Sequence, residues 1–277
     1  MKVEVAEHAG YCYGVERALK LAQEAVGKLP EPICTLGPII HNPQVVGWLK
    51  DKGISSVDSL DSIDKGTIII RSHGVDPTVK TAAKEKGLEV VDATCPFVKK
   101  AQHCGRKLVE EGYDPVIIGE RNHPEVIGIL AYAGGNAVVV ETIDDAKRLH
   151  DFDKVGIVVQ TTQPIENLKK VVNELIPKAT EIKIFNTICN ATVKRQIAAR
   201  NLAKKTDVIL VIGGKNSANT TRLAQICQDV NQRTYHIETA SEIKKEWFDN
   251  TNIVGVTAGA STPSWIIDEV VSVVSDI

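Results

Sequence analysis

An order of strands and helices that occurs three times along the 277 residues restricts the fold more than any other feature. Short runs rich in valine and isoleucine alternate with helical patterns, which is typical of parallel strands joined by crossover helices. Each copy begins with a cysteine followed at once by a helical segment: Cys12, Cys95 and Cys189. Because internal repetition decides the fold class, the sequence predicts three similar α/β units with parallel sheets.

Polar residues follow the three cysteines at matching distances. A first polar position comes 29, 28 and 28 residues after the cysteine, and a second comes 61, 66 and 72 residues after it. The first polar positions are His41, His123 and Ser217, and the second are His73, Thr161 with Thr162 beside it, and Ser261.

Eleven runs are predicted to be strands, about four to a unit, and KVEV near the N-terminus is assigned to the third unit. The predicted units are 13–95, 96–188, and 189–277 completed by 1–12. Ligands of open parallel sheets bind beyond the carboxyl ends of the strands, where nearly all of these polar residues lie. A pseudo-threefold arrangement with those ends inward brings three cysteines to one point.

The balance of charged residues and the N-terminal sequence reduce the number of function classes that fit this chain. Lys plus Arg number 33 against 35 Asp plus Glu, so no overall field favours nucleic acid or an anionic membrane. The start, MKVEVAEHAG, is not a signal peptide, and no apolar run has the length of a membrane span. We therefore expect a cytoplasmic protein whose cysteines are free, catalytic or metal-bound.

The six cysteines divide into two groups. Cys34, Cys104 and Cys227 have no counterparts in the other copies and are interpreted as small buried hydrophobic residues. The three repeated cysteines lie at predicted helix starts, and Pro96 is suited to a first helical position. Helix N-termini stabilise negative charge, so the repeated cysteines indicate a metal site of thiolates.

Two kinds of metal fit three thiolates. Zinc accepts three sulfurs with one open position, although the paired C-x-x-C ligands of many zinc sites are absent. An iron–sulfur cluster normally takes four cysteines, and a cubane on three leaves one iron free to bind a substrate oxygen. The spacing of the cysteines alone does not distinguish zinc from an iron–sulfur cluster.

The polar positions predict a binding site for a compact, multiply charged group such as diphosphate. Neither a G-x-G-x-x-G fingerprint nor a P-loop is present. Glu125, two residues after His123, is a possible acid if it is buried beside an anion, and otherwise a solvated first-turn glutamate. The residues expected to hold the ligand are His41, Asn42, His73, His123, Thr161, Ser217, Asn219 and Ser261.

Several motifs closely resemble the LytB/IspH family of 4-hydroxy-3-methylbut-2-enyl diphosphate reductases, in order over essentially the whole chain. They are AGYCYGVERAL, GPIIHNP, RSHGV, DATCPFV, NHPEV, VQTT, CNATVKRQ, KNSANTTRL and VTAGAST. The resemblance implies a trefoil of three α/β domains around one central 4Fe-4S cluster per chain. It also implies the last step of the non-mevalonate isoprenoid route, in which the allylic diphosphate substrate loses its hydroxyl by two-electron reduction and yields isopentenyl and dimethylallyl diphosphates.

The resemblance implies roles residue by residue. Three cysteines match the cluster ligands and leave one iron open for the substrate hydroxyl, Glu125 matches the proton donor, and Thr161 matches its partner. Ala218 departs from the Ser-Ser-Asn of many relatives and offers only its backbone N–H. An electron donor of the ferredoxin or flavodoxin type is implied. The ligands are Cys12, Cys95 and Cys189, and the diphosphate positions are His41, His73, His123, Ser217, Asn219 and Ser261.

Two other functions are compatible with the same residues. A cluster-dependent hydratase or dehydratase also uses a three-cysteine cubane but needs no reductant. A redox-sensing or phosphate-binding module without enzymatic activity could hold a labile cluster or a structural zinc.

Overall fold

The computed structural model describes residues 1–277, and the chain divides into two compact units. Unit 1 comprises Met1–Glu16, Ile40–Trp48 and Asn190–Ile277, and unit 2 comprises Arg17–Ile39 and Leu49–Cys189. Three four-stranded sheets, all parallel, form the framework, so the prediction of three α/β units with parallel sheets is confirmed. No helix is both long and apolar enough to cross a lipid bilayer.

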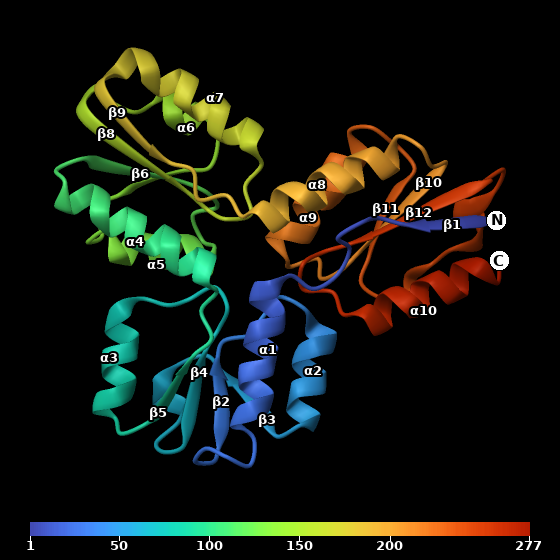
Figure 1. The fold of residues 1–277 in the computed structure, drawn as a ribbon, viewed down its shortest axis with the longest axis horizontal. Helices are drawn as coiled ribbons and strands as arrows, with labels where there is room; N and C mark the ends of the chain where they lie inside the picture. The colour runs from blue at the N-terminus through green and yellow to red at the C-terminus, as the bar shows by residue number, and fades with distance from the viewer. The chain divides into compact units, whose positions relative to one another are not determined.

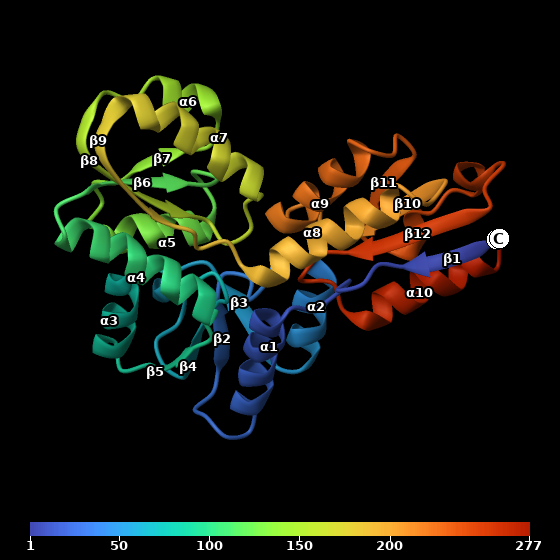
Figure 2. The same ribbon diagram turned by 45° about the horizontal axis from the view of Figure 1, so that its top comes forward.

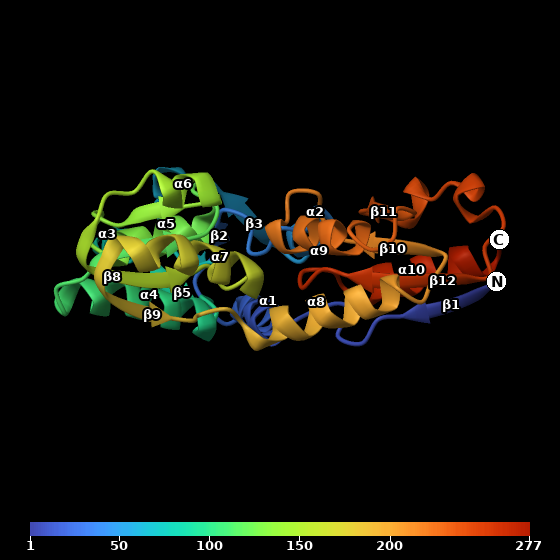
Figure 3. The ribbon, with the colours of Figure 1, turned by 90° about the horizontal axis from the view of Figure 1, so that it is seen from above.

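Sheet A belongs to unit 1 and has the order β1-β12-β10-β11. Apolar residues of its central strands alternate between two faces. Val208, Leu210 and Ile212 pack against α10, whereas Ile209 and Val211 pack against α8 and α9. Figure 2 shows β1 and β12 side by side and pointing the same way, and both chain ends lie at one end of this unit (Figure 3). The elements are β1 (Lys2–Val5), β10 (Val208–Ile212), β11 (Thr234–Ile237), β12 (Ile253–Ala258), α8 (Asn190–Ala203), α9 (Ala218–Gln228) and α10 (Ser264–Ser275).

Sheet B lies in unit 2 and has the order β3-β2-β4-β5. Strands β2 and β4 are buried along most of their length, and α3 covers one face through Ala83, which packs with Ile68 and Cys34 (Figure 1). Its elements are β2 (Ile33–Leu36), β3 (Ile54–Val57), β4 (Thr67–Ile70), β5 (Glu89–Asp92) and α3 (Pro77–Glu85). Two helices have residues in both units: α1 (Tyr13–Ala25) and α2 (Pro43–Asp51).

Sheet C, also in unit 2, has the order β7-β6-β8-β9. Its two faces are covered by α4 with α5 and by α6 with α7, because β6 directs Ile117 to the first pair and Val116 and Ile118 to the second (Figure 1). The elements are β6 (Asp114–Ile118), β7 (Val138–Val140), β8 (Phe152–Val159), β9 (Ala179–Phe185), α4 (Pro96–Glu110), α5 (Pro124–Tyr132), α6 (Ile143–Lys147) and α7 (Ile165–Leu175).

The three sheets repeat one strand order. In each sheet, three neighbouring strands come in the same order. The first strand ends before the repeated cysteine, the middle strand before the second polar position, and the third strand before the first polar position. These triplets are β1-β12-β10, β5-β4-β2 and β9-β8-β6. The N-terminal strand completes sheet A, and all eleven predicted strands are present. One strand was missed: β3, whose sequence ISSV has polar residues at two exposed positions.

The predicted domain boundaries at 95/96 and 188/189 stay a prediction, since the compact division of this chain is into two units.

Glycine in a central strand lets a helix approach closely, and Gly156 of β8 provides a test. A Cβ there would stand 2.9 Å from the Cγ of Leu108, a fully buried residue of α4. We expect Gly156→Ala to lower the free energy of unfolding by about 1–3 kcal/mol in urea denaturation, because the packed helix must shift. Gly47→Ala is the control: α2 has open space there, and a gain of about 0.5–1 kcal/mol is expected. Equal effects of the two substitutions would contradict this packing.

Candidate active site

The repeated cysteines are positioned by a hydrogen bond that recurs in all three sheets. The Cys12 N–H donates to the Ala260 carbonyl at 3.3 Å, the Cys95 N–H to the Ser72 carbonyl at 2.9 Å, and the Cys189 N–H to the Thr161 carbonyl at 3.0 Å. In each case the acceptor belongs to the loop that carries the second polar position of the same sheet. The cysteine and that polar residue are therefore fixed to each other through the backbone.

Each of these cysteines also stands directly before a helix. Cys95 is the N-cap residue of α4 with Pro96 at the first helical position, as predicted. Cys12 precedes α1 and Cys189 precedes α8. All three are half-buried and free of disulfides. The orphan N–H groups of a helix start interact favourably with a negatively charged group bound nearby.

The other three cysteines are buried in strand or helix, as predicted. Burial raises the pKa of the Cys104 thiol, and it raises that of Cys227 to about 12. Both therefore stay protonated near neutral pH, and a thiol is a poor metal ligand.

Glu125 in unit 2 is a buried carboxyl group, only 1% exposed. The Thr161 N–H donates to one carboxyl oxygen at 2.7 Å and the Thr161 hydroxyl to the other at 2.9 Å. Burial raises the pKa of Glu125 to about 7, against the opposing effect of these two hydrogen bonds. The solvated first-turn glutamate considered from the sequence is thus excluded, and the predicted contact with Thr161 is present.

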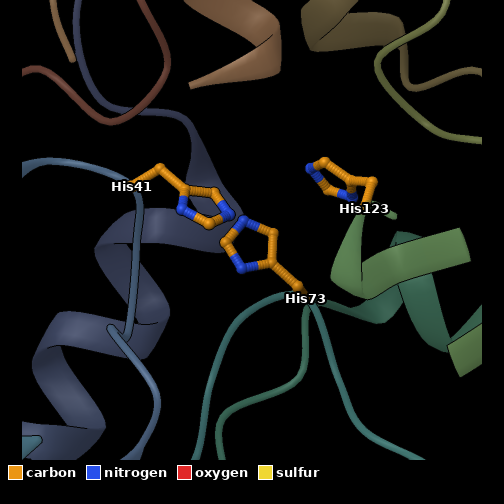
Figure 4. Close-up of side chains that lie close together, drawn as sticks. All are labelled: His41, His73 and His123. Carbon is orange, nitrogen blue, oxygen red and sulfur yellow. The ribbon is translucent and has the colours of Figure 1, made fainter. Parts of the chain in front are cut away.

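His73 and His123 meet edge to face in the same unit, with ring centroids 5.5 Å apart (Figure 4). His73 lies on the loop after β4, and His123 is the N-cap residue of α5. The His123 Nδ1 accepts from the Glu125 N–H at 3.1 Å, which leaves its Nε2 as the ring nitrogen able to donate when neutral. Two polar positions from different sheets therefore lie side by side, and one of them caps the helix that carries Glu125.

Sequence reasoning missed Gln160, a completely buried residue directly before Thr161. Its Oε1 accepts from the Glu120 N–H at 2.9 Å, and its Nε2 donates to the Thr162 hydroxyl at 3.1 Å. These bonds join the loop after β6 to the loop after β8, which holds Thr161 in place for Glu125. The VQTT motif contained this residue, but no spacing rule distinguishes a positioning amide from a surface glutamine.

Unit 1 brings together the remaining polar positions. The Ser261 hydroxyl donates to the His41 carbonyl at 3.2 Å, and a Cβ on Gly214 would stand 2.8 Å from that carbonyl oxygen. Ser217 caps α9, where its hydroxyl accepts from the Thr220 N–H at 3.4 Å. His41, also drawn in Figure 4, therefore lies beside both loops of sheet A.

Two carboxamide groups of unit 1 have buried nitrogens without a hydrogen-bond acceptor, those of Asn42 and Asn219. Leaving such a donor unpaired costs about 1–3 kcal/mol, and an anion supplies acceptors. Ala218 is the first residue of α9, so its backbone N–H is one of the orphan donors of a helix start. This donor set fits a phosphate-like group, and Asn219 is the member of it that was predicted to hold the diphosphate.

The predicted site residues are divided between the units. Cys12 belongs to unit 1, and the other two cysteines belong to unit 2. It therefore stays a prediction from sequence that the three cysteines bind one cluster. The roles assigned to the polar residues also stay predictions.

Comparison with known proteins identifies the family. The model of the LytB protein family matches residues 3–275. A 4-hydroxy-3-methylbut-2-enyl diphosphate reductase of Pelobacter propionicus is 52% identical over 277 residues, which cover 100% of this chain and 99% of the relative. The reductase of Trichlorobacter lovleyi is 53% identical over 272 residues, covering 98% and 97%.

Solved structures agree. One described as (E)-4-hydroxy-3-methyl-but-2-enyl diphosphate reductase, the terminal enzyme of the non-mevalonate pathway, is 49% identical with a TM-score of 0.73 and covers 100% of both chains. The E-1-hydroxy-2-methyl-but-2-enyl-4-diphosphate reductase of Plasmodium falciparum is 29% identical with a TM-score of 0.93, covering 99% of this chain and 88% of that one. The chain therefore belongs to the LytB family of diphosphate reductases.

Proposed function

We propose that this chain reduces 4-hydroxy-3-methylbut-2-enyl diphosphate to isopentenyl and dimethylallyl diphosphates, using a 4Fe-4S cluster bound by Cys12, Cys95 and Cys189. The observation that carries the proposal is Glu125, a protonatable carboxyl group held by Thr161 beside His123. Full-length relatives named for this reductase activity support it. They favour it over the dehydratase and sensor alternatives, because the named reaction consumes electrons.

The cysteines fit an iron–sulfur cluster by their chemistry. Three half-buried thiols at helix starts form one set, while the buried thiols of Cys104 and Cys227 are held protonated. Three cysteine ligands would leave one iron of a cubane without a protein ligand. When bound, the cluster would relay electrons from an external donor and offer a Lewis-acidic iron to the substrate oxygen.

We assign diphosphate binding to imidazole, hydroxyl and carboxamide groups at the repeated polar positions. In unit 2 these are His73 and His123, and in unit 1 they are His41, Ser217, Asn219 and Ser261. Their backbones are fixed by the loop hydrogen bonds described above, so binding orients the substrate before any bond changes.

The reaction consumes two electrons and two protons: Glu125 delivers the proton with which the hydroxyl leaves as water, and a second proton, ultimately from solvent, is added at carbon to complete either alkene. The Glu125 pKa of about 7 keeps a large fraction of the carboxyl protonated near neutral pH. Thr161 holds both carboxyl oxygens. When the protonated carboxyl donates to the Thr161 oxygen instead, the Thr161 hydroxyl can donate toward the substrate hydroxyl. The two electrons come from outside the chain, and we propose a ferredoxin or flavodoxin as donor. A cytoplasmic location likewise stays a prediction.

Replacing Glu125 by Gln tests the acid. We expect kcat to fall by about 10²-fold or more while visible absorption of the cluster is unchanged, because the amide keeps the shape but has no acidic proton. Glu166→Gln, which alters the exposed first-turn glutamate of α7, should leave kcat within about twofold. Normal turnover by Glu125→Gln would eliminate this role.

The raised pKa of Glu125 also makes stability depend on pH. The folded-state value of about 7 exceeds the ordinary 4.5, so the folded protein binds the proton more tightly than the unfolded chain. The resulting stabilisation is complete below pH 4.5 and is lost as the pH rises through about 7, with a total of about 3 kcal/mol. Urea denaturation across this window should show the loss in the wild-type chain and not in Glu125→Gln. Parallel curves would show that Glu125 does not titrate there.

Cysteine replacements test the ligand set. We expect Cys95→Ser to lose most bound iron and sulfide after anaerobic reconstitution, because a serine hydroxyl replaces a thiolate ligand. Cys104→Ala, nine residues along the same helix, should retain the iron content of the wild type. If both variants bind iron equally, the proposed ligand set is wrong.

A further inference from the structure

Arg71 is fixed at the carboxyl end of sheet B by the turn that carries His73. It follows β4 directly, and its carbonyl accepts from the Gly74 N–H at 3.0 Å. Inside the turn, the N–H and hydroxyl of Ser72 both donate to the Ile39 carbonyl, at 3.2 and 3.0 Å. The Cys95 N–H binds the turn from the other side. The backbone of Arg71 is therefore as rigid as that of the histidine two residues later.

The Arg71 side chain extends from β4 across the end of β2. Its Nη1 lies 2.7 Å from the place of a Cβ on Gly37, and its Cζ lies 3.5 Å from it. Gly37 has φ of +67°, which suits glycine, and its missing side chain makes room for the guanidinium. The cationic group thus rests over the carboxyl ends of two neighbouring strands, where ligands of parallel sheets bind.

The residue that directly follows the equivalent strand is different in the other two sheets. In sheet C it is Gln160, whose Oε1 stands 2.7 Å from the place of a Cβ on Gly119 and is fully hydrogen-bonded. In sheet A it is Gly259, and the Thr220 hydroxyl fills the space instead. A cation at this position is therefore specific to sheet B and is not required by the repeated fold.

Arg71 has no hydrogen bond or ion pair from its side chain, and its Nε is buried without a partner. The other buried or half-buried arginines all donate to an oxygen: Arg17, Arg195, Arg222 and Arg233. Burial lowers the pKa of Arg71, yet a guanidinium stays charged at any physiological pH. An unpaired, half-buried cation lowers stability, so an anionic ligand is the partner that its chemistry calls for.

We propose that Arg71 supplies the fixed positive charge that attracts and binds the substrate diphosphate, an inference that rests on the proposed function. The residues assigned to this group are otherwise imidazoles, hydroxyls and carboxamides, none of which carries a permanent charge. A guanidinium presents paired N–H donors that match phosphate oxygens. Arg71 accordingly contributes to affinity and not to the proton or electron transfer.

Kinetics of the anaerobically reconstituted full chain test this inference. Arg71→Met should raise KM for the allylic diphosphate and the inhibition constant of inorganic diphosphate by about tenfold, with kcat within about twofold. Arg71→Lys should restore part of the loss, because it keeps the charge but not the paired N–H donors. The dependence of KM on salt should weaken in Arg71→Met only. Thermal unfolding of Arg71→Met should begin no earlier than in the wild type, since an unpaired cation is removed.

Arg106→Met is the matched control, because it removes an exposed cation of α4 that pairs with Glu110; its KM should be unchanged. Equal inhibition by inorganic diphosphate in Arg71→Met and the wild type would overturn the proposal, and so would equal losses in the Met and Lys variants. Calorimetric measurement of inorganic diphosphate binding separates the anion site at Arg71 from the proposed reductase activity. If the wild-type chain binds it through Arg71 but does not turn over the allylic substrate, the proposed reaction fails while the anion site stands.

Discussion

The structure depends on one backbone hydrogen bond made three times. A cysteine amide donates to the loop that follows the neighbouring strand, at 3.3, 2.9 and 3.0 Å in the three sheets. Because the carboxyl ends of parallel strands lie at one edge of a sheet, this bond fixes each repeated cysteine to the loop of the second polar position with no side chain involved. The side chains are then free to differ among the copies, and they do: serine in sheet A, histidine in sheet B and threonine in sheet C.

The three copies differ in the side chain that fills one equivalent space. The space above the glycine that ends a central strand holds a bonded glutamine in sheet C, an unpaired arginine in sheet B and a threonine hydroxyl in sheet A. Sheet C thereby fixes Thr161 against a buried carboxyl, whereas sheet B leaves a cation available. The repeated fold unit thus carries a carboxamide, a guanidinium or a hydroxyl beside the equivalent strand ends.

Much of this was predictable from the sequence, because the repeat is recorded in spacing. The strand pattern, the assignment of KVEV to sheet A and the helix start at Cys95 with Pro96 all follow from local chemistry, and all are present. The strand β3 was missed because its polar ISSV has no apolar alternation. Gln160 and Arg71 were missed for a different reason: their roles depend on which neighbour lacks a side chain, and only three-dimensional pairing of strands reveals Gly119 and Gly37 beneath them.

Sheet A cannot be completed before strand β12 has been synthesised, because β1 pairs with β12. Sheets B and C use strands that are contiguous in sequence, so each can assemble while the ribosome is still at work, as N-terminal parts of nascent chains generally do. Sheet A joins Lys2–Val5 to Ile253–Ala258, and the acceptor for Cys12 is Ala260. The first cysteine to be synthesised is therefore the last of the three whose backbone hydrogen bond can form.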